Sequence, residues 1–133
     1  MAQSKEWQSF LRRILAEFSI QKYSVYDGNG SDMKLYCGVS LPELLIERYL
    51  SFRCTMVSEE SDGNRLITQV WVQNTVYLLV LYSKDALSEN DVCYILNDIV
   101  QLQKQLTESA ERSLHEYSAA HRNSKACPIE SRA

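Results

Sequence analysis

The sequence predicts an α+β sandwich, in which a single antiparallel β-sheet packs against an N-terminal α-helix and a long C-terminal α-helix. Three features carry this prediction: an apolar stripe with helical spacing over residues 7–18, two adjacent strand-like arms over residues 66–82, and a longer helical stripe after residue 88. In order, the chain reads as a helix, two strands, a short segment of ambiguous type, three strands and a long helix.

The length and charge of the chain limit what it can be. Its 133 residues, 45% of them hydrophobic, are enough for one domain and too few for two ordinary ones. We place this domain at residues 1–117. Residues 118–133 are small and polar, with Pro128 and no apolar repeat, and are predicted to be a disordered tail. The net charge of −3 argues against direct binding to nucleic acid, because phosphate binding favours a basic surface.

The N-terminal part reads as a helix followed by a hairpin. Ser4 can cap the helix, whose apolar positions recur at helical spacing: Trp7, Phe10, Leu11, Ile14, Leu15 and Phe18. Residues 22–27 and 33–39 read as strands, and the turn between them combines Asp-Gly with Asn-Gly. This turn lacks the Lys-Ser/Thr ending and the following helix of a phosphate-binding loop.

Residues 40–64 are harder to assign. Ser40 and Glu43 have the spacing of a capping box, with Pro42 in the first turn of the helix that would follow. Periodicity leaves residues 41–50 open between helix and strand. Residues 51–57 are predicted to be a strand, and residues 58–64, which include Glu59, Glu60 and Asp62, a solvated turn.

The central hairpin is formed by residues 66–73 and 75–82, which are rich in β-branched and aromatic residues. Gln73-Asn74 is the predicted turn, since Asn tolerates positive φ. Side chains alternate along a strand, so the second arm has two apolar faces: Val76, Leu78 and Val80 on one, and Tyr77, Leu79 and Leu81 on the other. One face suits the long helix. The other requires a second helix, a partner subunit or a ligand.

The last helix is predicted to run from Glu89 to about Tyr117. Ser88 is a suitable N-cap, and acidic residues in the first turn favour the positive end of the helix dipole. Its apolar stripe consists of Val92, Ile95, Leu96, Ile99, Leu102, Leu106, Ala110 and Leu114.

Catalytic and metal-binding patterns are not evident. The four cysteines form no CxxC pair and are expected to be reduced thiols. His115 and His121 fit neither a zinc motif nor a catalytic triad. The longest apolar run, residues 76–82, is too short to cross a bilayer. We therefore expect a cytoplasmic, non-enzymatic binding protein with no cofactor, no metal and no membrane insertion.

The apolar hairpin, the capped segment from Ser88 to Asp91 and the long helix give residues 75–106 the strongest family likeness. Together with the first helix and the small acidic chain, they resemble the class I type III secretion chaperones of bacterial pathogens. The resemblance covers about 110 residues and contains no diagnostic motif. It implies a chaperone that holds a secreted effector or gatekeeper client in an extended state. It also implies pairing with a second chaperone subunit or with itself. The size, the use of Cys and Ser and the polar tail are similar to those of one member of the family, and this likeness implies a contact with RNA polymerase in transcription regulation.

One feature departs from this family. The family usually places its second helix between the third and fourth strands, whereas the candidate helix at residues 41–50 comes one strand earlier. This puts the usual homodimer in doubt and favours a heterodimer. The element order also resembles roadblock or longin-like domains, which scaffold multiprotein complexes by sheet extension. A small enzyme with a site not visible in the sequence is the third alternative.

The partner-binding surface is expected on the first helix and the central hairpin. Strand addition to a sheet edge supplies affinity, and apolar pockets supply selectivity. The candidate partner-binding residues are Trp7, Phe10, Ile14, Ile67, Trp71, Leu78 and Val80.

Overall fold

The computed structural model describes residues 4–29 and 31–125, and the side chains up to residue 114. The elements are α1 (Lys5–Glu17), β1 (Ile20–Gly28), β2 (Met33–Gly38), α2 (Glu43–Ser51), β3 (Met56–Glu60), β4 (Gly63–Val72), β5 (Thr75–Ser83) and α3 (Glu89–Lys125). The predicted α+β fold with one antiparallel sheet, an N-terminal helix and a long C-terminal helix is confirmed.

The five strands lie in the order β2-β1-β5-β4-β3, and every neighbouring pair is antiparallel. Three hairpins join strands that are adjacent in sequence, while β5 also pairs with β1 and so occupies the centre of the sheet. A central strand is covered on both sides, which explains why both faces of β5 are apolar. The edges of the sheet are β2 and β3.

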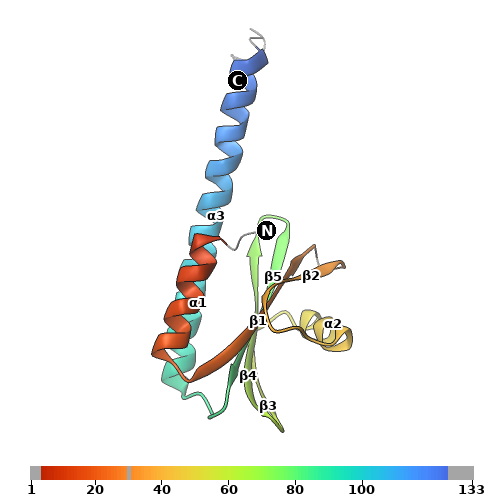
Figure 1. Ribbon diagram of the computed structural model, residues 1–133, viewed down its shortest axis with the longest axis vertical. Coiled ribbons are helices and arrows are strands. Elements are labelled where there is room, and N and C mark those ends of the chain that lie inside the picture. Colours follow the sequence, from red (N-terminus) through yellow and green to blue (C-terminus); the bar gives the residue numbers. More distant parts are fainter. Residues whose placement is uncertain (1–3, 30, 126–133) are drawn as a thin grey trace.

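The two faces of the sheet carry different helices, and α2 is the second cover that the two-faced strand requires (Figure 1). The long α3 packs beside α1 on one face. The core on that side includes Leu66, Leu79, Leu81, Ile95 and Leu102. The short α2 lies on the other face, over a smaller cluster that includes Tyr26, Ile46, Tyr49, Ile67, Leu78 and Val80.

Helix α1 begins as predicted, because the Ser4 side-chain oxygen accepts a hydrogen bond from the backbone N–H of Trp7 at 3.3 Å. The Trp7 ring packs against Tyr36 and Tyr77, with ring centroids 6.0 and 5.2 Å away. An ion pair between Arg13 and Asp98, at 3.5 Å, joins α1 to α3. The first helix is therefore held to both the sheet and the last helix.

Helix α2 settles the ambiguous segment as helical, but its start differs from the prediction. Pro42 is the N-cap and makes no side-chain capping bond, so Ser40 does not form the expected capping box. The helix is anchored instead by two hydroxyls. The Tyr26 hydroxyl accepts from the Leu41 N–H at 2.7 Å, and Arg65 donates to the Tyr49 hydroxyl at 2.9 Å.

Strand β3 lies later in the chain than predicted. Residues 51–57 were expected to form it, but Ser51 ends α2 and β3 covers Met56–Glu60. Cross-strand pairing decides this boundary, because the register runs from Met56 opposite Ile67 to Glu60 opposite Gly63. The predicted turn at residues 58–64 therefore shrinks to Ser61 and Asp62. Charged residues on an edge strand discourage pairing with other chains.

The central hairpin turns at Gln73 and Asn74 as predicted, with Val72 opposite Thr75. The positive φ falls on Gln73, at 56°, whereas the prediction relied on Asn74. A left-handed conformation at a residue with a Cβ costs roughly 1–2 kcal/mol. The paired arms of the hairpin on both sides of the turn hold it in place.

Helix α3 extends further than predicted. It was expected to end near Tyr117, but it continues to Lys125, so the first eight residues of the predicted tail are helical. No Pro or Gly interrupts the sequence between Glu89 and Pro128, which removes the usual reason for a helix to stop. The C-terminal part of α3 projects beyond α1 and the sheet (Figure 1). Residues 126–133 of the predicted tail lie outside the described residues.

Candidate functional site

The structure places most of the candidate partner-binding residues in the interior. Six of the seven have exposed fractions of 2% or less: Trp7, Phe10, Ile14, Ile67, Leu78 and Val80. The first three lie under α1 and the last three under α2. They were expected to be exposed because the sequence does not say which helix covers which face. As placed, they form the core and offer no surface to a partner.

Trp71 is the exception. It lies near the end of β4 with 45% of its surface exposed, and it pairs across the sheet with Val76. Its side chain points to the α2 side of the sheet, as do those of Ile67 and Gln69, because side chains two apart share a face. It is not part of the cluster of buried side chains beneath α2.

The strand that carries Trp71 is only half paired on its outer side. Pairing between β3 and β4 starts at Met56 opposite Ile67, so Thr68 to Val72 have no strand beside them on that side. A hydrogen bond of 2.7 Å joins the Thr55 and Thr68 hydroxyls. It marks the point where the segment before β3 separates from β4. From Thr68 onwards, β4 therefore forms an edge of the sheet, although β4 lies between β5 and β3 in the strand order.

The orientation of the backbone at this edge follows from the ladder pattern. In a hairpin with a two-residue turn, the flanking residues, Val72 and Thr75, exchange the hydrogen bonds. The backbone groups of Trp71 therefore point away from β5, and those of Gln69 do the same two residues earlier. The Trp71 carbonyl agrees with this, since it accepts a hydrogen bond of 2.8 Å from Gln103 Nε2 on α3. We call residues 69–72 the open edge of β4.

The Gln69 side chain organises the surroundings of this edge. Its Nε2 donates to the carbonyl oxygens of Phe52 at 2.8 Å and Leu50 at 3.1 Å, which lie at and just after the C-terminal end of α2. Its Oε1 accepts from the Trp71 indole N–H at 3.2 Å. One amide therefore fixes both the end of α2 and the orientation of the exposed indole.

A hollow of about 460 Å³ lies along the open edge. Its lining residues are Arg53, Cys54, Thr55, Thr68, Gln69 and Trp71. Arg53 is the only charged side chain in this lining, and both Arg53 and Cys54 are exposed. The hollow therefore combines a stretch of backbone with no neighbouring strand, an aromatic surface and one positive charge.

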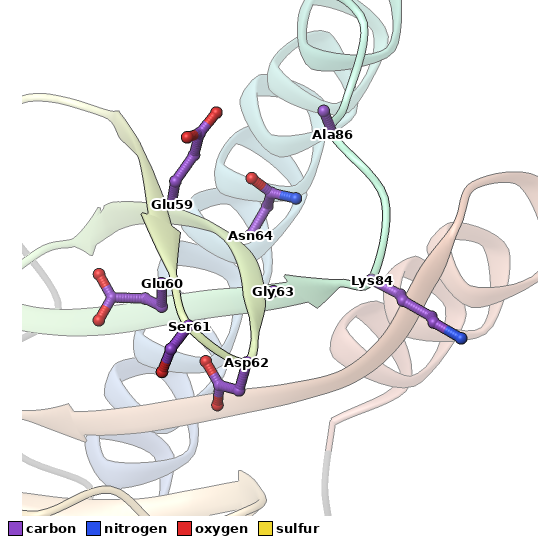
Figure 2. A pocket seen from close by; sticks show the side chains of 8 residues that line it. All are labelled: Glu59, Glu60, Ser61, Asp62, Gly63, Asn64, Lys84 and Ala86. Atoms are coloured by element: carbon purple, nitrogen blue, oxygen red, sulfur yellow. The ribbon is translucent and has the colours of Figure 1, made fainter.

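A second hollow, of about 490 Å³, surrounds the β3–β4 turn and contains the acidic residues noted in the sequence. Figure 2 shows that the carboxylates of Glu59, Glu60 and Asp62 point in different directions and that Lys84 extends away from the turn. Within the part of the chain that the structure describes, no three His, Cys, Asp or Glu side chains are grouped to hold a metal ion. The divergent carboxylates do not form an acid–base pair.

Among the cysteines that the structure describes, Cys54 and Cys93 are exposed while Cys37 is partly buried. Burial, with a smaller contribution from the negative charge of Asp27, raises the pKa of the Cys37 thiol to about 11. A protonated thiol is a poor nucleophile. The described residues also include no helix that is long and apolar enough to cross a membrane.

Comparison with known proteins finds a solved structure with a similar fold but assigns the chain to no family. No protein-family model matches the sequence, and no curated protein is significantly similar to it. Among solved structures, the chain is similar to the GAF domain of a two-component sensor histidine kinase from Bacillus halodurans. The TM-score is 0.61 at 16% sequence identity, and the alignment covers 87% of this chain and 98% of that domain. At this identity the likeness concerns the fold alone.

Proposed function

We propose that this chain is a non-enzymatic binding protein that takes up an extended segment of a partner protein as an added strand on the open edge of β4. The observation that carries the proposal is that Gln69 and Trp71, whose backbone groups point away from β5, have no strand beside them and lie next to an exposed indole. An added strand supplies main-chain hydrogen bonds to these groups, and side-chain contacts supply selectivity.

The side-chain contribution can be estimated from area. A tryptophan buries up to about 250 Å², so covering the exposed part of Trp71 removes roughly 100 Å² from water. At about 25 cal/mol per Å², this contributes about 2.5 kcal/mol. Such a contribution, added to two or three backbone hydrogen bonds of about 1 kcal/mol each, is typical of a moderate-affinity, reversible contact.

The arrangement of elements favours a scaffold over a secretion chaperone within this proposal. Helix α2 lies between β2 and β3, in the element order that resembles roadblock or longin-like domains, and one strand earlier than in the chaperone family. The similar solved structure is the GAF domain of a two-component sensor histidine kinase. A secreted client, a second chaperone subunit and RNA polymerase stay predictions of the family resemblance.

The proposal is tested by recovering partners from cells that make this protein. The wild-type chain, Trp71→Ala and a matched control, Tyr94→Ala, are each used as bait. Tyr94 is a good control because it is an aromatic residue on α3 with 65% of its surface exposed. We expect one partner to be retained by the wild type and the control and lost with Trp71→Ala.

The recovered partner must then be shown to form hydrogen bonds with the backbone of the open edge. Amide hydrogen exchange should slow at Gln69 and Trp71 when the partner is bound, because their N–H groups become donors to the added strand. Slower exchange on α3 or α1 with unchanged exchange at Gln69 and Trp71 contradicts the proposal, as does a partner whose binding survives Trp71→Ala.

A further inference from the structure

We infer that the added strand runs antiparallel to β4 and carries an apolar side chain beside Trp71, followed two residues later by an Asp or Glu that pairs with Arg53. This inference rests on the proposed function and specifies the chemistry of the partner. It assigns the site an Φ-x-Asp/Glu pattern, where Φ is apolar and the pattern is read from N- to C-terminus.

The direction follows from the existing sheet. Strand β3 is antiparallel to β4 and stops at Met56, opposite Ile67, so a guest beyond that point extends the line of β3 along the remaining half of β4. An antiparallel guest also places its hydrogen bonds directly opposite the outward backbone groups of Gln69 and Trp71. Its residue opposite Trp71 then precedes its residue opposite Gln69 by two positions.

The face follows from the pleat. Guest residues opposite Trp71 and Gln69 point to the α2 side of the sheet, where the indole and the hollow lie. An apolar side chain opposite Trp71 buries the exposed indole surface. Cross-strand aromatic–aliphatic pairs of this kind are favourable in antiparallel sheets. The intervening guest residue points to the α3 side, where Val70 and Val72 are already buried.

The charge follows from Arg53. Salt bridges among the described residues join Arg13 to Asp98 and Arg65 to Asp62, and neither uses Arg53. Arg53 is exposed and is the only charged residue that lines the hollow. The guest side chain opposite Gln69 points into this hollow. A carboxylate there meets a guanidinium with no competing acid in the lining, whereas a lysine is repelled.

Four synthetic ten-residue peptides in one Thr/Ser host test the inference with the full chain. Their central residues are Ile-Thr-Glu, Ile-Thr-Gln, Ile-Thr-Lys and the reversed Glu-Thr-Ile, and binding is measured by calorimetry at low and high salt. We expect the first peptide to bind about tenfold more tightly than the Lys peptide at low salt, with the difference shrinking as salt rises. Arg53→Glu should reverse this preference, while Arg12→Glu, an exposed charge reversal on α1, should not.

The outcomes separate this inference from the proposed function. If the Glu and Lys peptides bind equally and both need Trp71, strand addition holds and the acidic pattern is wrong. If the reversed peptide binds best, the direction is wrong. If no peptide binds and none changes exchange at Gln69 and Trp71, the proposed function fails together with the inference. Protection of these amides that rises with protein concentration alone makes a second copy the occupant and overturns the inference.

Discussion

The side chain of Gln103 donates a hydrogen bond of 2.8 Å to the backbone carbonyl oxygen of Trp71, across 32 positions in the sequence. It supplies to one acceptor of β4 what a neighbouring strand would otherwise supply. Helix α3 is thereby joined to the open edge as well as to the core. The same amide competes with any added strand for the Trp71 carbonyl.

Replacing Gln103 with Ala should therefore change stability and binding in opposite directions. We expect the free energy of unfolding to fall by about 0.5–1.5 kcal/mol through loss of one hydrogen bond, and strand-forming peptides to bind more tightly. Chemical denaturation and peptide titration measure the two effects. Lys104→Ala, at the exposed neighbouring position, is the control and should change neither. Weaker peptide binding by Gln103→Ala contradicts competition for this carbonyl.

Substitution of Gln69 tests whether its side-chain amide stabilises the C-terminal end of α2 as a hydrogen-bond donor. Gln69→Glu keeps an acceptor for the Trp71 indole but replaces the donor that serves the carbonyls of Leu50 and Phe52. A carboxylate beside these carbonyls, near the negative end of a helix dipole, is repelled. We expect Gln69→Glu to lower the free energy of unfolding by about 1–3 kcal/mol, and by more than Gln69→Ala. A loss confined to Gln69→Ala would refute the assigned amide orientation.

The two tryptophans are a matched pair for separating core from surface. Trp7 is fully buried among Phe10, Tyr36 and Tyr77, so Trp7→Ala should cost about 3–5 kcal/mol of stability. Trp71 is 45% exposed, so Trp71→Ala should cost clearly less. Thermal or denaturant unfolding followed by circular dichroism gives both values. Equal losses would mean that the Trp71 indole is held more tightly than its exposure indicates.

The helices and strands were predicted from the sequence more accurately than the way in which the helices cover the two faces of the sheet. Alternating apolar residues on β5 indicated two buried faces, and the structure covers them with α3 and α2. Yet the same alternation does not state which cover is present, so Leu78 and Val80 were assigned to a partner surface although α2 buries them. Periodicity describes one element, whereas burial depends on elements that are distant in sequence.

The candidate site at the open edge of β4 could not be predicted from the sequence, for a related reason. Trp71 was among the expected partner residues, but the open edge on which it lies results from the late start of β3 at Met56. That boundary is fixed by pairing with β4 and not by local propensity, because residues 51–57 are as strand-like as Met56–Glu60. The contributions of Gln69 and Gln103 arise from contacts 17–32 positions away, and nothing in the sequence indicates them.

Alkaline pH should weaken the fold. The pKa of the Cys37 thiol is raised to about 11 by burial and then by the charge of Asp27, and burial also raises the pKa of the Tyr77 hydroxyl. The folded state then binds these protons more tightly than the unfolded state. Its stabilisation is present below about pH 9 and is lost as the pH rises through 11. Urea unfolding between pH 8 and 11 should show this decline, with a smaller slope for Cys37→Ser.

Thiol alkylation gives an independent check on Cys37. Only a thiolate reacts readily, so partial burial and a raised pKa should make Cys37 much slower to react than the exposed Cys54 and Cys93. We expect iodoacetamide at pH 8 to modify Cys54 and Cys93 well before Cys37, as read by peptide mass spectrometry over time. In denaturant the three rates should converge, because the environment that separates them is lost. Equal reaction rates of Cys37 and Cys54 in the native protein would contradict this expectation. They would mean that Cys37 does not stay packed in solution against the core cluster that lies under α1. The strand β2 that carries it would then separate readily from β1, and the exposed edge of β1 would compete with the open edge of β4 for an added strand.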